Sequence, residues 1–228
     1  SDQSDVEKII ELYEDRKNTS KPFYLFNVTM QNHGGFDKSY SNFTNDVQIT
    51  DNHKNEQAEQ YLSLIKKTDE AFEYLVDYFS GVDEPTIIVM FGDHQPAVTS
   101  RFYDSILGKS SDELTSEELM KKYQTPFIIW ANYDIEETTI EKMSANYLSA
   151  YVLQEAGLKM TPYQKFLMKL YKKLPVISAM GAYDADGYYY ESVKETPYED
   201  MVQEYQILQY NNLIDTDHTV NSFFYLKE

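Results

Sequence analysis

The chain has 228 residues, 42% of them hydrophobic and 15% aromatic, and a formal net charge of −18 at pH 7. This length and apolar content fit one medium-sized domain, with or without a small appendage, and argue against wholesale disorder. The charge excludes sequence-independent binding to nucleic acid, which needs lysine and arginine, and the lack of cysteine excludes disulfides, thiolate metal sites and cysteine nucleophiles.

The N-terminal residues predict a helix followed by a strand. Residues 4–16 have helical character, with Ser4 as the expected N-cap and Glu7 three residues later, in a capping-box pattern. Aromatic and β-branched residues are then concentrated over residues 23–29, with the sequence FYLFNVT. Such a composition predicts a buried strand.

The next segments predict a long loop, a long helix and a second strand. Residues 30–55 are polar and contain glycine, and a loop of this length inside a compact domain is usually functional or mobile. Apolar residues recur at helical spacing over residues 56–79, and Gly81 is the expected stop. The uninterrupted apolar run at residues 86–91 is typical of a central strand covered on both faces, as in a parallel sheet.

The alternation of strands and helices continues along the chain. We expect short helices over residues 101–107 and 115–122, a strand over residues 125–131 and a helix over residues 144–156. A sequence of this order is typical of an α/β sheet flanked by helices.

The C-terminal residues differ in character from the rest. The expected elements are helices over 161–173 and 195–213, a short strand or turn over 187–190 and a terminal strand over 222–226. We therefore expect residues 161–228 to form a small α+β subdomain appended to a domain of residues 1–160.

Chemistry-bearing residues follow the apolar strand at residues 86–91. Asp93 and His94 come at its carboxyl end, where ligands bind in open α/β sheets. An anionic oxygen and a neutral imidazole suit Mn²⁺, Zn²⁺ or iron, and Gly92 would let the backbone approach an ion closely. The alternative for these residues is an ordinary turn in which the aspartate caps the next segment.

A second polar cluster follows the strand predicted at residues 23–29. Asn32 and His33 lie there in a loop that contains glycine. A solvated loop histidine is the simpler interpretation of His33 taken alone. Two histidines at strand ends of one sheet make a shared cleft a better hypothesis than either histidine does separately.

Three segments in this order and spacing resemble a known family. PFYLFNVTMQNHGGF, IIVMFGDHQP and TPFIIWANYD are similar to sequences of the lipoteichoic acid synthase-type phosphoglycerol transferases, in the sulfatase branch of the alkaline phosphatase superfamily. The helical segment YLSLIKKTDEAFEYLVDYF and the tail segment EYQILQYNNLID are also similar. The resemblance therefore extends over most of the chain and implies a partial sulfatase-like sheet.

The resemblance implies roles for the two polar clusters. Asp93 and His94 would be ligands of a catalytic divalent ion, most often Mn²⁺ in this family, with Mg²⁺ or Zn²⁺ as alternatives. His33 would be catalytic and, with Asn32, would contact the anionic head group of a glycerophospholipid. In the family mechanism a metal-activated threonine attacks phosphatidylglycerol, diacylglycerol leaves, and the phosphoglycerol passes to an acceptor.

The sequence also departs from the family pattern. The family's nucleophilic threonine and an acidic metal ligand precede the histidine motif, yet only 32 residues precede His33 here, and no apolar run approaches the roughly 20 residues of a membrane helix. We therefore expect the C-terminal portion of an enzyme that acts at the extracellular face of a bacterial membrane. This portion should bind Mn²⁺ weakly or not at all, be inactive alone, and self-associate through exposed sheet edges.

Other interpretations remain open at this point. The chain could belong to a sulfatase, phosphodiesterase or phosphoethanolamine transferase of the same superfamily, or it could be a binding module without catalysis. A second cluster, Asp215 and His218, lies outside the matched segments, and we interpret it as a surface turn.

Overall fold

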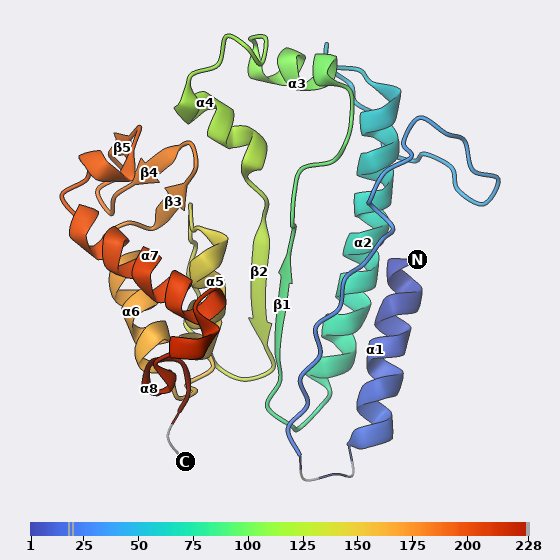
Figure 1. Ribbon diagram of the computed structural model, residues 1–228. Coiled ribbons are helices and arrows are strands. Elements are labelled where there is room, and N and C mark those ends of the chain that lie inside the picture. The colour runs from blue at the N-terminus through green and yellow to red at the C-terminus, as the bar shows by residue number, and fades with distance from the viewer. Residues whose placement is uncertain (18, 20, 227–228) are drawn as a thin grey trace. The chain divides into compact units, whose positions relative to one another are not determined.

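The computed structural model describes residues 1–17, 19 and 21–226 (Figure 1). The chain divides into two compact units. Unit 1 comprises Ser1–Thr86 with Phe91–Leu114, and unit 2 comprises Ile87–Met90 with Thr115–Glu228.

Unit 1 is built on two packed helices, α1 (Asp2–Arg16) and α2 (Glu56–Ser80). Their contact is largely aromatic, since the rings of Tyr13 and Phe79 are both buried and meet edge to face with their centroids 5.1 Å apart. Offset and edge-to-face ring pairs add to the stabilisation that comes from burying the ring area. The helix expected over residues 56–79 is confirmed, and Gly81 ends it with φ −89°, outside the left-handed region.

The start of α1 differs from the sequence prediction. Ser1 is the N-cap, and its hydroxyl oxygen accepts a hydrogen bond from the backbone N–H of Ser4 at 3.3 Å. Ser4 as the N-cap is therefore wrong, because Ser4 lies in the first turn and donates to the cap. The two serines are spaced such that either one fits a capping pattern, and only the structure distinguishes them.

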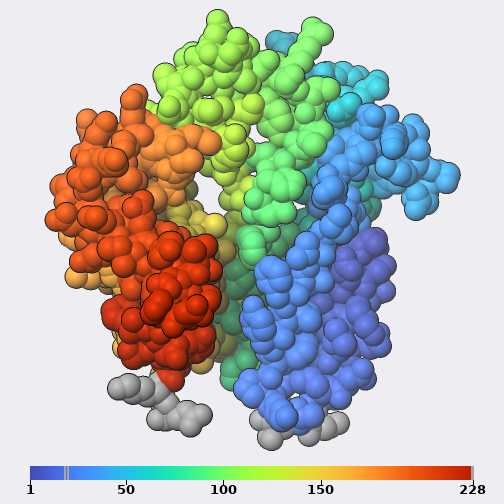
Figure 2. Space-filling view, in the orientation of Figure 1, coloured from blue at the N-terminus to red at the C-terminus, as the bar shows by residue number. Residues whose placement is uncertain are grey.

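The strand predicted at residues 23–29 does not form. The segment is extended but pairs with no strand among the described residues, and Tyr24 and Phe26 are 86% and 65% exposed. Figure 2 shows the corresponding blue segment at the surface of the viewed face. Strand formation needs a neighbour that supplies the ladder of hydrogen bonds, and composition alone cannot provide one.

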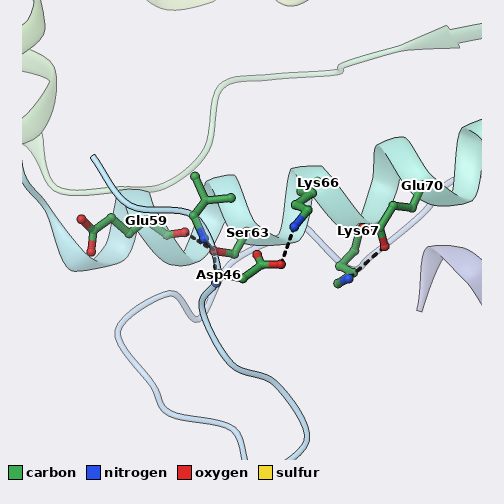
Figure 3. Close-up of polar contacts among 7 residues, drawn as sticks. Asp46, Glu59, Ser63, Lys66, Lys67 and Glu70 are labelled. Carbon is green, nitrogen blue, oxygen red and sulfur yellow. Dashed lines mark hydrogen bonds and ion pairs between the residues drawn. The ribbon is translucent and has the colours of Figure 1, made fainter. Parts of the chain in front are cut away.

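The loop over residues 30–55 is confirmed, and it is held along α2 by buried polar side chains. Ser63 is fully buried, and its hydroxyl oxygen accepts the backbone N–H groups of Asp46 at 3.1 Å and Val47 at 3.0 Å while donating to the Glu59 carbonyl at 2.8 Å. Figure 3 shows these bonds beside the Lys66–Asp46 ion pair. Two further contacts of this kind join Gln60 to the Lys38 carbonyl and Glu59 to the Ile49 N–H. Hydrogen bonds to side chains of α2, and not pairing with a strand, therefore hold this loop in place.

Unit 2 contains a two-stranded sheet, β1 (Ile87–Phe91) with β2 (Phe127–Ala131). Both expected strands are present, but their arrows run in opposite directions in Figure 1, so this pair is not the parallel one that was predicted. Neither strand is fully buried. In the sequence, the two strands are separated by α3 (Ser100–Leu107), which belongs to unit 1, then by α4 (Ser116–Met120) and the short 3₁₀ helix η1 (Lys121–Tyr123).

The core of unit 2 lies among α5 (Ala145–Glu155), α6 (Pro162–Tyr171) and α7 (Glu199–Leu213). Its most deeply buried side chains are Tyr147, Leu170 and Leu174. Thr161 and Gln164 form a capping box that starts α6, so the beginning of this helix is encoded locally.

A small antiparallel sheet completes unit 2, with β3 (Val176–Ser178), β4 (Gly181–Tyr183) and β5 (Tyr189–Tyr190) in that order. Gly181 has φ +127°, and a Cβ at this position would lie 2.4 Å from the Tyr190 carbonyl oxygen, so only glycine fits.

The terminal strand predicted over residues 222–226 is wrong. The chain forms the helical turn α8 (Asn221–Phe224) there, and the ring of Phe224 packs against Tyr163 of α6 with centroids 5.3 Å apart. The remaining short elements are the 3₁₀ helices η2 (Val193–Glu195) and η3 (Thr216–His218). The α/β fold class is confirmed, whereas the boundary at residue 160 stays a prediction.

Candidate functional site

Asp93 and His94 lie in the turn directly after β1, as the sequence predicts. Their side chains are 75% and 60% exposed, and the carboxylate oxygen Oδ2 of Asp93 lies 3.6 Å from the ring nitrogen Nε2 of His94. The other oxygen, Oδ1, accepts the backbone N–H of His94 at 2.8 Å. The aspartate therefore stabilises the turn with one oxygen and presents the other beside the imidazole.

The imidazole of His94 has a definite orientation. Its Nδ1 lies 2.9 Å from the backbone carbonyl oxygen of Gln95. A carbonyl oxygen can only accept, so this contact requires a proton on Nδ1 and leaves the lone pair of a neutral ring on Nε2. Histidines that bind metals are commonly held in this way, by a hydrogen bond from the nitrogen that does not bind the ion. Nε2 of His94 and Oδ2 of Asp93 thus form an exposed pair of donor atoms suited to a divalent cation.

The turn after Asp93 and His94 is fixed from within unit 1. Tyr103 of α3 donates its hydroxyl proton to the Pro96 carbonyl at 2.6 Å, and burial raises the pKa of this phenol. Asn55 accepts the Ala58 N–H as the N-cap of α2 and donates from Nδ2 to the hydroxyl of Thr99 at 3.0 Å. One asparagine therefore joins the starts of α2 and α3.

His33 and Asn32 occupy a tight turn in which they face different environments. The N–H of His33 donates to the Met30 carbonyl at 3.3 Å, and the His33 side chain is exposed. Asn32 instead faces α2 and donates from Nδ2 to the hydroxyl of Thr68 at 2.8 Å. The structure thus presents His33 to solvent and turns the half-buried Asn32 toward α2, where its Nδ2 has a partner and its buried Oδ1 has none among the described residues.

The two polar clusters both belong to unit 1, but they do not touch each other. Among the described residues, no hydrogen bond or ion pair links His33 to Asp93 or His94, and no group of three or more acidic or histidine side chains could hold a metal ion. Asp93 and His94 fit two coordination positions of an ion, whereas metal sites in enzymes generally take three or more protein ligands. A complete site would need further donors.

The side chains of the other two histidines, His53 and His218, each have a polar partner. Nδ1 of His218 lies 2.7 Å from Oδ1 of Asp215 within one turn, as expected for a surface turn. Nδ1 of His53 lies 2.6 Å from the hydroxyl of Ser105 on α3. Within residues 1–17, 19 and 21–226, no helix is long and apolar enough to span a membrane.

Comparisons with known proteins agree with this fold. The Sulfatase family model matches residues 1–158, so the chain belongs to the Sulfatase family. The fold is similar to that of the Streptococcus pyogenes phosphoglycerol transferase GacH in complex with sn-glycerol-1-phosphate, with a TM-score of 0.67 and 19% identity. The chain is also 25% identical, over 230 residues, to a Rhizobium meliloti (strain 1021) protein that carries the name cyclic beta-1,2-glucan modification protein.

The chain is shorter than these relatives. The alignment covers 100% of the chain but 53% of GacH, and 98% of the chain but 36% of the Rhizobium protein. The resemblance deduced from the sequence motifs is confirmed at the level of the family and the fold. The comparisons do not show the activity of a whole enzyme.

Sequence inspection missed the residues that support the site. Thr68 bonds the residue before His33, Asn55 bonds Thr99 after the Asp93–His94 turn, and Ser63 fixes a more distant part of the loop that contains His33. The asparagine before a helix was a recognisable N-cap signal. Serine and threonine inside a helix gave no comparable signal, because exposed ones are common there.

Proposed function

We propose that this chain is the C-terminal portion of a metal-dependent phosphoglycerol transferase that acts on phosphatidylglycerol-type phosphodiesters outside the cell membrane. The observation that carries the proposal is the exposed donor pair of Asp93 and His94 after β1, with its imidazole oriented by the Gln95 carbonyl. Membership of the Sulfatase family supports it, because enzymes of this superfamily generally use a divalent ion.

In the proposal, Asp93 and His94 supply two ligands of a divalent ion, with Mn²⁺ the first candidate and Mg²⁺ or Zn²⁺ the alternatives. When bound, the ion would activate the attacking hydroxyl and neutralise charge on the phosphoryl oxygens. The positive charge of the ion would also allow an anionic substrate to approach a chain whose net charge is −18.

His33 has the complementary role of contacting the phosphoglycerol head group and holding a proton at the reacting oxygen. Its exposure within unit 1 supports this role. The inward orientation of Asn32 makes it a support for the turn more readily than a second group on the substrate. The structure of GacH holds sn-glycerol-1-phosphate, which is the same chemical class of ligand.

The proposal includes the inactivity of this portion alone. Two ligands give a weak metal site, and neither the nucleophilic threonine nor the membrane helices of the family are recognised in the sequence. The exposed side chains of Tyr24 and Phe26, in a segment of strand-forming composition, support the idea that another part of the enzyme, or a second copy, covers them.

Two measurements test the proposal. Titration calorimetry of the 228-residue chain with MnCl₂ should give no tight stoichiometric binding, and tight binding that His94→Ala abolishes would overturn the idea of an incomplete site. In the longer protein that contains this chain, release of diacylglycerol from phosphatidylglycerol vesicles should require Mn²⁺. It should fall by roughly 100-fold or more in Asp93→Asn, His94→Ala and His33→Ala.

His218→Ala is the matched control, because this histidine is exposed and its imidazole pairs with Asp215 of the same turn. Activity in the control should be unchanged. Sulfate ester hydrolysis, or transfer of phosphoethanolamine in place of phosphoglycerol, would assign a different substrate of the same superfamily.

A second candidate is a binding module without catalysis. The observation in its favour is that no group of three potential metal ligands occurs in the described part of the chain. Full activity of the longer protein with Asp93→Asn would support this candidate over the transferase.

A further inference from the structure

Beneath the turn that carries His33 lies a cluster of buried polar side chains from three segments. Asp2 comes from the first turn of α1, Thr68 from the middle of α2, and Gln31 and Asn32 from the turn itself. Asp2 is 2% exposed and Thr68 is 8% exposed. Hydrogen bonds satisfy part of this cluster, whereas Oδ1 of Asp2 and Oδ1 of Asn32 are buried with no hydrogen-bond partner among the described residues.

The hydroxyl of Thr68 is the central link of the cluster. Its oxygen lies 2.8 Å from Nδ2 of Asn32, 2.5 Å from Oδ2 of Asp2 and 3.3 Å from the Leu64 carbonyl oxygen. An amide nitrogen can only donate, so the hydroxyl accepts from Asn32 and has one proton to give. The carboxylate is the nearer and charged acceptor, and it takes that proton in place of the usual carbonyl one helical turn back.

Gln31 is held by the same two helices. Its Nε2 donates to the Leu64 carbonyl at 3.3 Å, and its Oε1 accepts the backbone N–H of Asp2 at 3.2 Å. Both residues that precede His33 are therefore fixed by α1 and α2.

The residues that follow His33 are held by shorter-range contacts: the Gly35 carbonyl oxygen accepts the backbone N–H of Lys38 at 3.2 Å and the hydroxyl proton of Tyr40 at 3.3 Å. Gly34 and Gly35 have φ values of 152° and 81°, a region that glycine enters easily. The chain is anchored again at Phe36, which is buried with its ring 5.5 Å from that of Tyr61 on α2. The contacts that join the His33 turn to both α1 and α2 therefore lie on its N-terminal side, at Gln31 and Asn32.

We propose that Thr68, oriented by Asp2, is a positioning residue for His33. Its hydroxyl holds the Asn32 amide, and this bond fixes the backbone from which the imidazole projects. The inference rests on the proposed function in that His33 is taken as the group that meets the phosphoglycerol. Thr68 itself contacts only atoms of this chain, so its effect on any reaction passes through His33.

Nuclear magnetic resonance of the 228-residue chain tests this directly, because the chain has four histidines and three of them are internal controls. Thr68→Val keeps the shape of the side chain and removes the hydroxyl, whereas Thr68→Ser keeps the hydroxyl. In Thr68→Val we expect the ring signals of His33 to shift. Hydrogen exchange at the side-chain amide nitrogen Nδ2 of Asn32 should accelerate by at least about tenfold. The ring signals of His53, His94 and His218 should be unchanged, and Thr68→Ser should restore those of His33.

Two results would overturn the inference. If the His33 ring signals in Thr68→Val match those of the unaltered chain while thermal stability falls, Thr68 has a structural role only. If Thr68→Ser shifts His33 as much as Thr68→Val does, the methyl group and not the hydroxyl is responsible.

Asp2→Ala provides the same readout if Thr68→Val does not fold, since it leaves the threonine methyl in place and removes the acceptor. None of these signals depends on catalysis. The positioning role of Thr68 can therefore be refuted while the transferase proposal holds, and it can be supported while the transferase proposal is refuted.

Discussion

Replacing Ser63 by alanine tests how the loop over residues 30–55 is held on α2. The hydroxyl of Ser63 is fully buried and accepts two backbone N–H groups, those of Asp46 and Val47 (Figure 3). Alanine has nearly the same volume and a higher helix propensity, so neither packing nor the helix itself should suffer. The substitution isolates the two hydrogen bonds between loop and helix.

The expected cost follows from these two bonds. A typical hydrogen bond inside a protein contributes a net of about 0.5–1.5 kcal/mol, so losing two costs about 1–3 kcal/mol. The donation from Ser63 to the Glu59 carbonyl adds little, because helix carbonyls already accept a backbone bond. With a urea m-value of roughly 3 kcal/mol/M, the unfolding midpoint of unit 1 should fall by roughly 0.3–1 M.

The assay combines urea unfolding with amide hydrogen exchange. Exchange at Asp46 and Val47 should accelerate in Ser63→Ala, because their N–H groups lose their acceptor, while the amides of α2 retain their protection. Ser80→Ala is the matched control, since the Ser80 hydroxyl is exposed and bonds only to the Val76 carbonyl of the preceding turn. Its free energy of unfolding should stay within about 0.5 kcal/mol of the parent value.

One result would refute the reasoning. If Asp46 and Val47 exchange at the parent rate in Ser63→Ala, the loop is held by other contacts. The exposed ion pair of Lys66 with Asp46 is the obvious alternative, and Lys66→Met would then have the larger effect on exchange.

Three further predictions concern the core, a helix start and high pH. Leu170→Ala, at a fully buried position in the core of unit 2, should cost about 2–5 kcal/mol in thermal unfolding, and a cost below 1 kcal/mol would contradict the assigned core. Thr161→Ala removes the capping box of α6 and should cost about 1 kcal/mol, whereas Thr161→Ser should cost less. Burial, and then the hydrogen bond to Glu14, raise the pKa of Tyr78 from 10.0 to about 12. A raised pKa means that the folded state binds this proton more tightly, so its contribution to stability is complete below pH 10 and is lost as the pH rises towards 12. Tyr78→Phe should remove this part of the loss of stability at high pH. The difference in tyrosinate absorbance between the two proteins measures the ionisation of Tyr78 that causes it.

The long helix α2, and the location of one half of the candidate site, are predicted by the sequence alone. The apolar periodicity over residues 56–79 predicts α2 because helical hydrogen bonds form between residues four apart and need no distant partner. Asp93 and His94 were recognisable for a similar reason, since an apolar strand followed directly by a glycine and two polar residues is a local pattern.

Only the tertiary structure decides which strand-forming segments become strands. Residues 23–29 have the composition of a strand, but no other described segment supplies hydrogen bonds to them. Residues 222–226 are similarly aromatic, yet Phe224 packs on Tyr163 of α6 and the chain forms a helical turn. A strand depends on a partner that is distant in sequence, so its existence cannot be read from the segment itself.

The support of the site is likewise a property of the fold. Ser63 and Thr68 are ordinary residues of a helical sequence, and they acquire a role because α1 and the loop over residues 30–55 bring donors and acceptors to them. Burial makes those contacts matter, because a buried polar group without a partner costs more than the same group in water. The sequence thus predicts which residues carry chemistry, and the folded chain determines which residues hold them in place.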